Sequence, residues 1–342
     1  MMNEVKKIAF VVDGGIKIGL GHVYQSITFA NLLKNKAEIY FMTKSDDIVI
    51  NKIKEAGFAA HKFSSDLEIL DYIEQNEPNI VIFDKIDTSA ELAKNIKKNN
   101  KIILAIFTNL TNANRYADVA VTADIGSHFN NIKHFNSDTN TLYFYGPKYW
   151  ILRKEFHDCN QLNKPRPESV DNILISFGGS DPANLTTLVT NELLGFNHDI
   201  RINIILGASF THFESLERVL KEDAEKSKNV IIHRDVNNVA NLMFNSDLVI
   251  ASPGLSAFEA LFVRTPILLF PQDQIQKETY QGFMKVIDKA EIDCLRDCIA
   301  RMDFTYPDEE DIINMKIGQG SEEIINAILG NEADCLESTK EK

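Results

Sequence analysis

The chain has 342 residues, of which 44% are hydrophobic and 25% charged, and its formal net charge at pH 7 is −13. This composition is typical of a globular protein with room for two domains of ordinary size. The acidic balance argues against nucleic acid or an anionic membrane as the main partner, because both require clustered lysine and arginine. No apolar stretch is long enough to span a bilayer, and the N-terminal residues lack the apolar core of a secretion signal, so we expect a cytoplasmic protein.

Cysteine and histidine spacing gives no sign of a metal or redox site. The four cysteines, at positions 159, 294, 298 and 335, lack the paired spacing of zinc and redox motifs. His128 and His134 lie in a polar stretch without acidic neighbours at ligand spacing. We therefore expect neither a bound metal nor a cofactor.

The first half of the chain alternates short apolar segments with amphipathic ones. This alternation predicts an α/β fold with a parallel sheet that helices cover on both faces. Residues 124–140 are polar and aperiodic, so we expect a long loop or a surface insertion there. The expected strands are 8–12, 38–42, 58–63, 79–84, 101–107 and 119–122, and the expected helices are 23–33, 47–56, 67–75 and 89–98.

A polar, proline-bearing stretch at 157–170 is the expected linker, and the same alternation restarts after it. We therefore predict one Rossmann-like domain at 1–156, a second at 171–328 and a charged, frayed tail at 329–342. The expected strands of the second domain are 172–177, 203–206, 230–233, 248–251 and 266–270. Its expected helices are 182–194, 239–244, one starting near 256, 277–289 and 312–329, the last with a break at Gly318 and Gly320.

A glycine-rich turn, Asp13-Gly14-Gly15-Ile16-Lys17-Ile18-Gly19-Leu20-Gly21-His22, joins the first strand to the first helix. Its glycines let backbone N–H groups approach a ligand closely, and the start of a helix favours an anion. The pattern therefore predicts a phosphate-bearing ligand with His22 beside it. The alternative is an ordinary tight connection with a histidine facing solvent.

Asp84 ends a buried strand of the same sheet. Because ligands of parallel sheets bind beyond the carboxyl ends of the strands, His22 and Asp84 are expected to meet at one edge. The alternative for Asp84 is the cap of a turn or helix.

Two more turns at helix starts lie in the second half. Gly178-Gly179-Ser180-Asp181-Pro182 precedes one helix, and Ser252-Pro253-Gly254-Leu255-Ser256 precedes another. Phosphate at Gly254 to Ser256, with Glu259 accepting hydrogen bonds from ribose hydroxyls, would make a nucleotide site. The alternative is a capping box of Ser256 and Glu259, which needs no ligand. Gln272 and Asp273 follow a later strand, at a sheet edge where a polar ligand would be met.

Four segments occur in a familiar order: residues 18–22, 149–156, 177–185 and 252–261. Together they resemble the nucleotide-sugar hydrolases of the pseudaminic acid pathway and the related spore-coat polysaccharide proteins, which are similar in fold to GT-B glycosyltransferases. The resemblance covers roughly residues 5–328. It implies two facing doubly wound domains that bind a substrate in the cleft between them.

The resemblance also implies an activity and a set of site residues. The activity is hydrolysis of a UDP-linked 2,4-diacetamido-2,4,6-trideoxy sugar, in which a neutral histidine accepts a proton from the attacking water. Metal is not required if helix N-termini supply the positive potential. His22 and Asp13 are the implied catalytic residues. The implied sugar-binding residues are Gly19, Gly21, Gln25, Asp84, Tyr149, Arg153, Gln272 and Asp273, and those for UDP are Gly178, Gly179, Ser180, Asp181, Gly254, Leu255, Ser256 and Glu259.

The chain departs from the family pattern at three positions. Val11 and Gln25 replace arginines, and Ile86 replaces a tyrosine. Because of these changes, the identity of the sugar stays open, and two other functions stay possible alternatives to hydrolysis. One is a GT-B glycosyltransferase that moves the sugar to an acceptor, and the other is a nucleotide-sugar binding protein without turnover.

Overall fold

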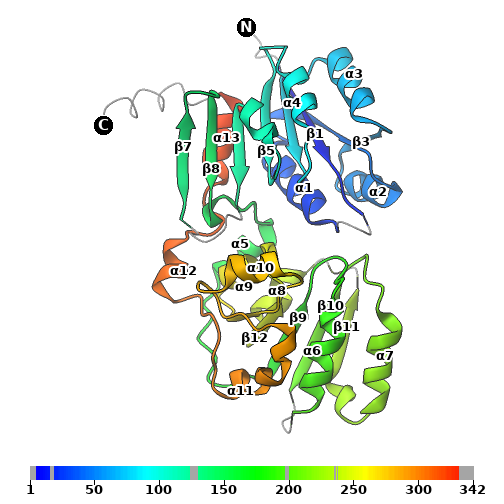
Figure 1. Cartoon of the computed structure of the whole chain (residues 1–342), viewed down its shortest axis with the longest axis vertical. Coiled ribbons are helices and arrows are strands. Elements are labelled where there is room, and N and C mark those ends of the chain that lie inside the picture. The colour runs from blue at the N-terminus through cyan, green and yellow to red at the C-terminus, as the bar shows by residue number, and fades with distance from the viewer. Residues whose placement is uncertain are drawn as a thin grey trace.

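The computed structural model describes residues 5–15, 19–123, 130–196, 200–234, 236 and 238–330. The chain folds into two lobes, each built on its own sheet, with the N-terminal lobe above the C-terminal lobe in Figure 1. In the described residues, the first sheet has eight strands in the order β3-β2-β1-β4-β5-β6-β8-β7 and the second has five in the order β11-β10-β9-β12-β13. Every strand pair is parallel except β7 with β8. The prediction of two parallel-sheet α/β domains is therefore confirmed.

In the first lobe, the apolar strand sequences are buried because helices cover both faces of the sheet. The central strands β1 and β4 show this most clearly, since every residue of β4 is buried. The elements are β1 (Lys6–Val12), α1 (Gly21–Leu33), β2 (Ala37–Thr43), α2 (Asp47–Glu55), β3 (Ala59–Lys62), α3 (Asp66–Asn76), β4 (Ile80–Asp84), α4 (Ala90–Ile96), β5 (Ile103–Phe107), a 3₁₀ turn (Asn112–Tyr116), β6 (Val119–Thr122), β7 (Ile132–Asn136), β8 (Thr141–Tyr145) and a second 3₁₀ turn (Pro147–Tyr149).

The expected loop at 124–140 is wrong in its second half. Residues 132–136 form β7, which pairs with β8 across a turn. The Asn136 side chain closes this turn by accepting hydrogen bonds from the backbone N–H groups of Asp138 and Thr139. Because β7 is an exposed edge strand, its sequence lacks the apolar alternation that would have predicted it. Residues 124–129 of that stretch, His128 included, lie outside the described residues.

The second lobe repeats the layered arrangement around its smaller sheet. The expected helix at 277–289 is wrong after Tyr280, because Gly282 adopts φ of +95° and the chain turns. The elements of this lobe are α5 (Lys154–Asn160), β9 (Asn172–Ser176), α6 (Leu185–Leu194), β10 (Arg201–Leu206), α7 (Phe213–Glu222), a 3₁₀ turn (Lys226–Asn229), β11 (Val230–Arg234), α8 (Val239–Phe244), β12 (Leu248–Ala251), α9 (Leu255–Phe262), β13 (Ile267–Leu269), α10 (Gln274–Tyr280), a 3₁₀ turn (Lys289–Cys294), α11 (Leu295–Ala300) and α12 (Glu310–Asn314). The last described element, α13 (Ser321–Leu329), follows them in the chain.

The chain crosses between the lobes twice, and this changes the predicted domain limits. Helix α5 begins before the expected linker, and its Phe156 and Cys159 are buried in the second lobe. Helix α13 returns to the first lobe, where its isoleucines join the core, as Figure 1 shows in red. The two crossings are joined by hydrogen bonds from the N–H groups of Gly318 and Gly320 to the carbonyls of Pro147 and Lys148. The predicted second domain therefore loses its last helix to the first lobe. Residues 331–342 of the expected tail lie outside the described residues.

Candidate functional site

The first glycine turn brings the start of α1 against the end of β1. Gly15 and Gly19 exchange backbone hydrogen bonds of 2.9 and 2.8 Å, and both have positive φ. A Cβ on Gly14 would lie 2.6 Å from a Val23 methyl group, so only glycine fits there without a shift. Residues 16–18 of the turn lie outside the described residues. The turn sets His22 in the first turn of α1, as predicted.

His22 and Asp84 meet at the edge of the first sheet. The Nδ1 atom of His22 lies 2.8 Å from Oδ1 of Asp84. The Asp84 side chain is fully buried, whereas that of His22 is 20% exposed. A carboxylate can only accept, so Nδ1 carries the hydrogen of this bond and the neutral ring has its lone pair on Nε2. This arrangement is the one required of a general base.

The surroundings of His22 raise its pKa above the usual value. Burial on its own would lower the pKa of this imidazole, but the charge and hydrogen bond of Asp84 outweigh it, with help from the charges of Asp13 and Asp87. The ring is therefore a stronger base than a free histidine.

Asp13 lies close to this pair but is bound to other groups. Its Oδ2 atom is 2.7 Å from the ammonium of Lys85, and its Oδ1 atom accepts from the Lys44 N–H at 2.9 Å. Burial raises the pKa of Asp13, but Lys85 and Lys44 lower it by more, so the pKa lies below the usual value. An ion-paired carboxylate of this kind is a weak base. The catalytic role of Asp13 therefore stays a prediction, and its contact with Lys85 gives it a structural one.

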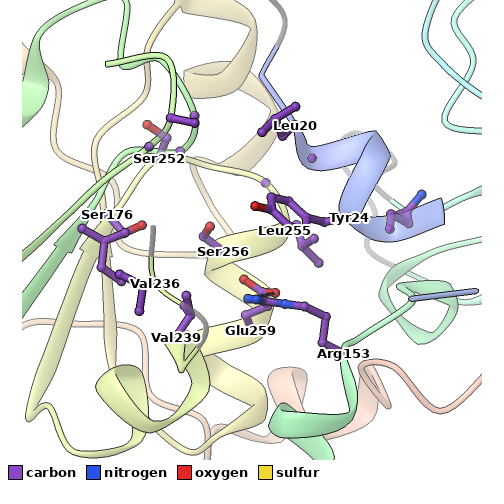
Figure 2. A pocket seen from close by; sticks show the side chains of 18 of the residues that line it. Leu20, Tyr24, Arg153, Ser176, Val236, Val239, Ser252, Leu255, Ser256 and Glu259 are labelled. Atoms are coloured by element: carbon purple, nitrogen blue, oxygen red, sulfur yellow. Dashed lines mark hydrogen bonds and ion pairs between the residues drawn. The ribbon is translucent and has the colours of Figure 1, made fainter. Parts of the chain in front are cut away.

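A cavity of about 330 Å³ lies between the lobes, beside α1 (Figure 2). His22 is not in its lining, although its neighbours Gly21 and Gln25 are. The first-lobe lining is Leu20, Gly21, Tyr24, Gln25 and Thr28, the crossing adds Ile151 and Arg153, and the second-lobe lining is Ser176, Gly178, Gly179, Ile205, Leu206, Gly207, Ala208, Ser209, Val236, Val239, Ser252, Pro253, Gly254, Leu255, Ser256 and Glu259.

The turn at residues 207–209, after β10, is a part of the site that sequence reasoning missed. A Cβ on Gly207 would lie 2.4 Å from the carbonyl oxygens of both Gly178 and Gly179, so the two turns touch backbone to backbone. The Ser209 N–H donates to the Gly179 carbonyl at 2.9 Å, and its hydroxyl reaches the Gly15 carbonyl of the other lobe at 3.4 Å. A glycine directly after a predicted strand was the available signal.

Helix α9 begins at the cavity without a side-chain cap. Its first residue is Leu255, and the preceding Gly254 has φ of +128°. The alternative interpretation of Ser256 and Glu259 as a capping box is therefore wrong, because Ser256 already lies inside the helix. An uncapped helix start that faces a cavity can receive an anionic group.

Buried Glu259 and partly exposed Arg153 form an acid–base pair at the cavity wall, drawn together in Figure 2. Oε1 of Glu259 lies 3.4 Å from Nη2 of Arg153, whose Nη1 is 2.9 Å from Oε1 of Glu155. Burial raises the pKa of Glu259 to about 7, although Arg153 opposes this rise. Glu259 therefore changes charge near neutral pH.

Besides His22, Asp13, Gly19 and Asp84, five predicted site residues lie outside the cavity lining. Tyr149 was expected to bind the sugar, but this is wrong because the ring is buried in the first-lobe core against Gly320, with its hydroxyl 3.4 Å from Glu323. The others are the following: Ser180, Asp181, which accepts from the N–H groups of Leu185 and Thr186, Gln272, which bridges Asp181 and Ser252, and Asp273, which caps α10.

The Asp181 bonds also move the start of α6. They set the first turn at Leu185, so the prediction that Pro182 is the first helical residue is wrong.

Among the described residues, no group of three or more His, Cys, Asp or Glu side chains is placed to hold a metal ion. In the same ranges, no helix combines the length and the apolar character needed to cross a bilayer.

The chain is similar in sequence to two known proteins over most of its length. No model of a known protein family matches the chain. It is 40% identical over 326 residues to the uncharacterized protein MJ1062 of Methanocaldococcus jannaschii, covering 94% of this chain but only 66% of that protein, just under two thirds. It is 26% identical over 285 residues to the spore coat polysaccharide biosynthesis protein SpsG of Bacillus subtilis, covering 81% and 80% of the two chains.

Solved structures resemble the whole chain in fold. MurG of Acinetobacter baumannii superposes with a TM-score of 0.62 at 14% identity, over 95% of this chain and 99% of that one. The fold is GT-B. HepE of Anabaena, solved with UDP-glucose, has a TM-score of 0.54 at 13% identity, over 97% and 99% of the two chains. At these identities the likeness establishes the GT-B fold alone.

Proposed function

We propose that this protein binds a nucleotide sugar between its lobes and transfers the sugar to an acceptor. The observation that carries the proposal is the pairing of His22 with buried Asp84 beside a cavity whose opposite wall is an uncapped helix start. The GT-B fold supports this assignment, since MurG and HepE share it. The printed name of SpsG supports a role in making a surface polysaccharide.

The second lobe would hold the nucleotide. Its diphosphate would lie at the start of α9 and at the turns of Gly178 and Gly207, where backbone N–H groups can donate to an anion. Glu259 would accept hydrogen bonds from the ribose. Ile205 and Val239 line the same cavity and offer apolar surface for the base. UDP is the nucleotide expected, since HepE was solved with it.

The first lobe would supply the chemistry. Nε2 of His22 would take a proton from the acceptor hydroxyl as its oxygen attacks the anomeric carbon, while the bond from that carbon to the diphosphate breaks. Asp84 would stabilise the resulting imidazolium. A positioned base of this kind contributes about 10²- to 10⁴-fold in rate. Hydrolysis, the activity that the sequence resemblance implies, follows from the same geometry when water replaces the acceptor.

Product analysis with a His22→Ala variant tests the proposal. Purified protein is incubated with UDP-sugars, with and without saccharide acceptors, and released UDP is measured. We expect acceptor-dependent release that falls at least about 10²-fold in His22→Ala, while UDP binding by calorimetry stays unchanged. His134→Ala, on the exposed strand β7, is the matched control.

Three outcomes separate the alternatives. Release of UDP without an acceptor would favour hydrolysis over transfer. Tight binding of UDP without turnover on any sugar would favour a binding protein. Normal turnover by His22→Ala, or no binding of any nucleotide, would contradict the proposal.

A further inference from the structure

Two neutral side chains of α1 hold the carboxylate that lies beneath His22. Nε2 of Gln25 donates to Oδ2 of Asp84 at 3.1 Å, and Oγ of Ser26 donates to the same oxygen at 2.9 Å. The other oxygen, Oδ1, faces Nδ1 of His22 at 2.8 Å. Gln25 is 8% exposed and Ser26 is 1% exposed. The carboxylate therefore has one oxygen fixed by α1 and one left for the imidazole.

The spacing along α1 explains how three side chains reach one carboxylate. Residues 22, 25 and 26 stand three and four apart, so they lie on one face of the helix, over the end of β4. The Gln25 amide is also tied to a second strand end, because it lies 3.4 Å from the hydroxyl of Thr108 after β5. The amide therefore contacts residues at the ends of two neighbouring strands, β4 and β5.

The charge of Asp84 is not shared with a basic side chain. In the described ranges, no lysine or arginine forms an ion pair with it. The adjacent Lys85 turns instead to Asp13 at 2.7 Å and to Asp87 at 3.2 Å. The charges of Asp13 and Asp87 also act on His22. Neutral donors on Oδ2 thus orient the carboxylate without cancelling its charge.

We propose that Gln25 and Ser26 are positioning residues that act through Asp84 to keep the hydrogen of neutral His22 on Nδ1 and its lone pair on Nε2. The proposed function depends on this tautomer, since only Nε2 can face a substrate while Nδ1 is bonded to Asp84. A carboxylate that turned away from Nδ1 would no longer accept its hydrogen bond, and the preference for the Nδ1–H tautomer would then weaken. The inference deepens the proposed function but concerns the free protein, so it can be tested without any substrate.

Imidazole ¹⁵N shifts measured by NMR report the tautomer and the pKa of His22 directly. The chain has eight histidines, and His22 is assigned by the signal that disappears in His22→Gln. In the native protein we expect the Nδ1–H form to be at least about tenfold more abundant than the Nε2–H form. In Gln25→Met with Ser26→Ala, which removes both donors at little change in volume, we expect the two forms to be within about threefold of each other.

A second variant tests the electrostatic part. Gln25→Arg places a cation beside Asp84, which disfavours the imidazolium, so we expect the proton affinity of His22 to fall about tenfold. Asn31→Ala is the control, because Asn31 is an exposed residue of α1 whose amide donates to the Ile27 carbonyl of the same helix. If the double variant does not fold, Ser26→Ala and Gln25→Met are measured separately, and each is expected to shift the tautomer ratio part of the way.

The results also separate this inference from the proposed function. An unchanged tautomer ratio in the donor variants, or an unchanged His22 pKa in Gln25→Arg, would overturn the positioning role even if the protein transfers sugar. Conversely, the expected NMR shifts in a protein without turnover would uphold the positioning role and contradict the enzyme assignment.

Discussion

The two sides of the cleft are built in different ways. On the first lobe, the site is a network of side chains in which buried Asp84 bonds His22, Gln25 and Ser26. On the second lobe, it is mostly backbone, with the turns at Gly178 and Gly207 in contact and a bare helix start at Gly254. The first lobe is therefore suited to proton transfer and the second to binding, because side chains can take up and release protons whereas backbone N–H groups only donate hydrogen bonds. Substitutions on the two sides should then affect different steps.

The largest expected effect is on the first-lobe side, in Asp84→Asn. The amide can still accept a hydrogen bond from Nδ1, but it cannot stabilise an imidazolium by charge. We expect turnover to fall about 10²- to 10³-fold while the affinity for UDP stays within about twofold. Steady-state kinetics and calorimetry on the same sample make the comparison.

Stability against pH gives a control for this variant. Because folding raises the pKa of His22, its contribution to the free energy of unfolding is full below the unfolded pKa of about 6.5 and is lost as pH rises through the folded pKa. Asp84→Asn should remove this dependence. A loss of UDP affinity as large as the loss of turnover would contradict the division between the lobes.

The next effect is on the second-lobe side, in Gly207→Ala. The new methyl group would lie 2.4 Å from the Gly178 and Gly179 carbonyls, so the two turns must separate. We expect the affinity for UDP to fall about tenfold and the melting temperature to drop, since overpacking typically destabilises by about 1–3 kcal/mol. Thr211→Ser, at an exposed position just after this turn and outside the cavity lining, is the matched control for calorimetry. Equal affinities in the two variants would separate this turn from the nucleotide.

The smallest expected effect is a pH dependence that comes from Glu259. Its pKa of about 7 means that the carboxylate is mostly protonated at pH 6 and mostly ionised at pH 8. If ribose hydroxyls donate to the carboxylate, the affinity for UDP-glucose should rise by up to about tenfold over this interval. Glu259→Gln should bind with an affinity that is flat over the same range. A flat profile in the native protein would remove Glu259 from the ribose site.

The pairing of His22 with Asp84 could be predicted from the sequence because it depends on local features of the chain. His22 follows a glycine turn and Asp84 ends an apolar strand, and parallel strands bring such ends to one edge. The bonds from Gln25 and Ser26 were not predicted, because they depend on the rotation of α1 over β4. The contact of Gly207 with Gly178 was missed for a similar reason, since it joins turns from neighbouring strands.

Errors at the lobe boundary have the same origin. Tyr149 lies in a segment that resembles a ligand-binding motif, yet its ring packs against Gly320, which is distant in sequence. The return of α13 to the first lobe could not be read from periodicity either. An amphipathic helix shows which face is buried but not which core receives it.

The two crossings between the lobes are hydrogen-bonded to each other at Pro147 and Gly318, and this bears on how the lobes can move. A single flexible connection would let the lobes rotate in any direction relative to each other. Two crossings that are hydrogen-bonded to each other would instead favour rotation about one axis. An opening of the cavity that keeps these hydrogen bonds would be a rotation of the lobes about the two crossings. The hydrogen bond from the Ser209 hydroxyl to the Gly15 carbonyl also joins the two lobes, and it would break if the cavity opened at that side.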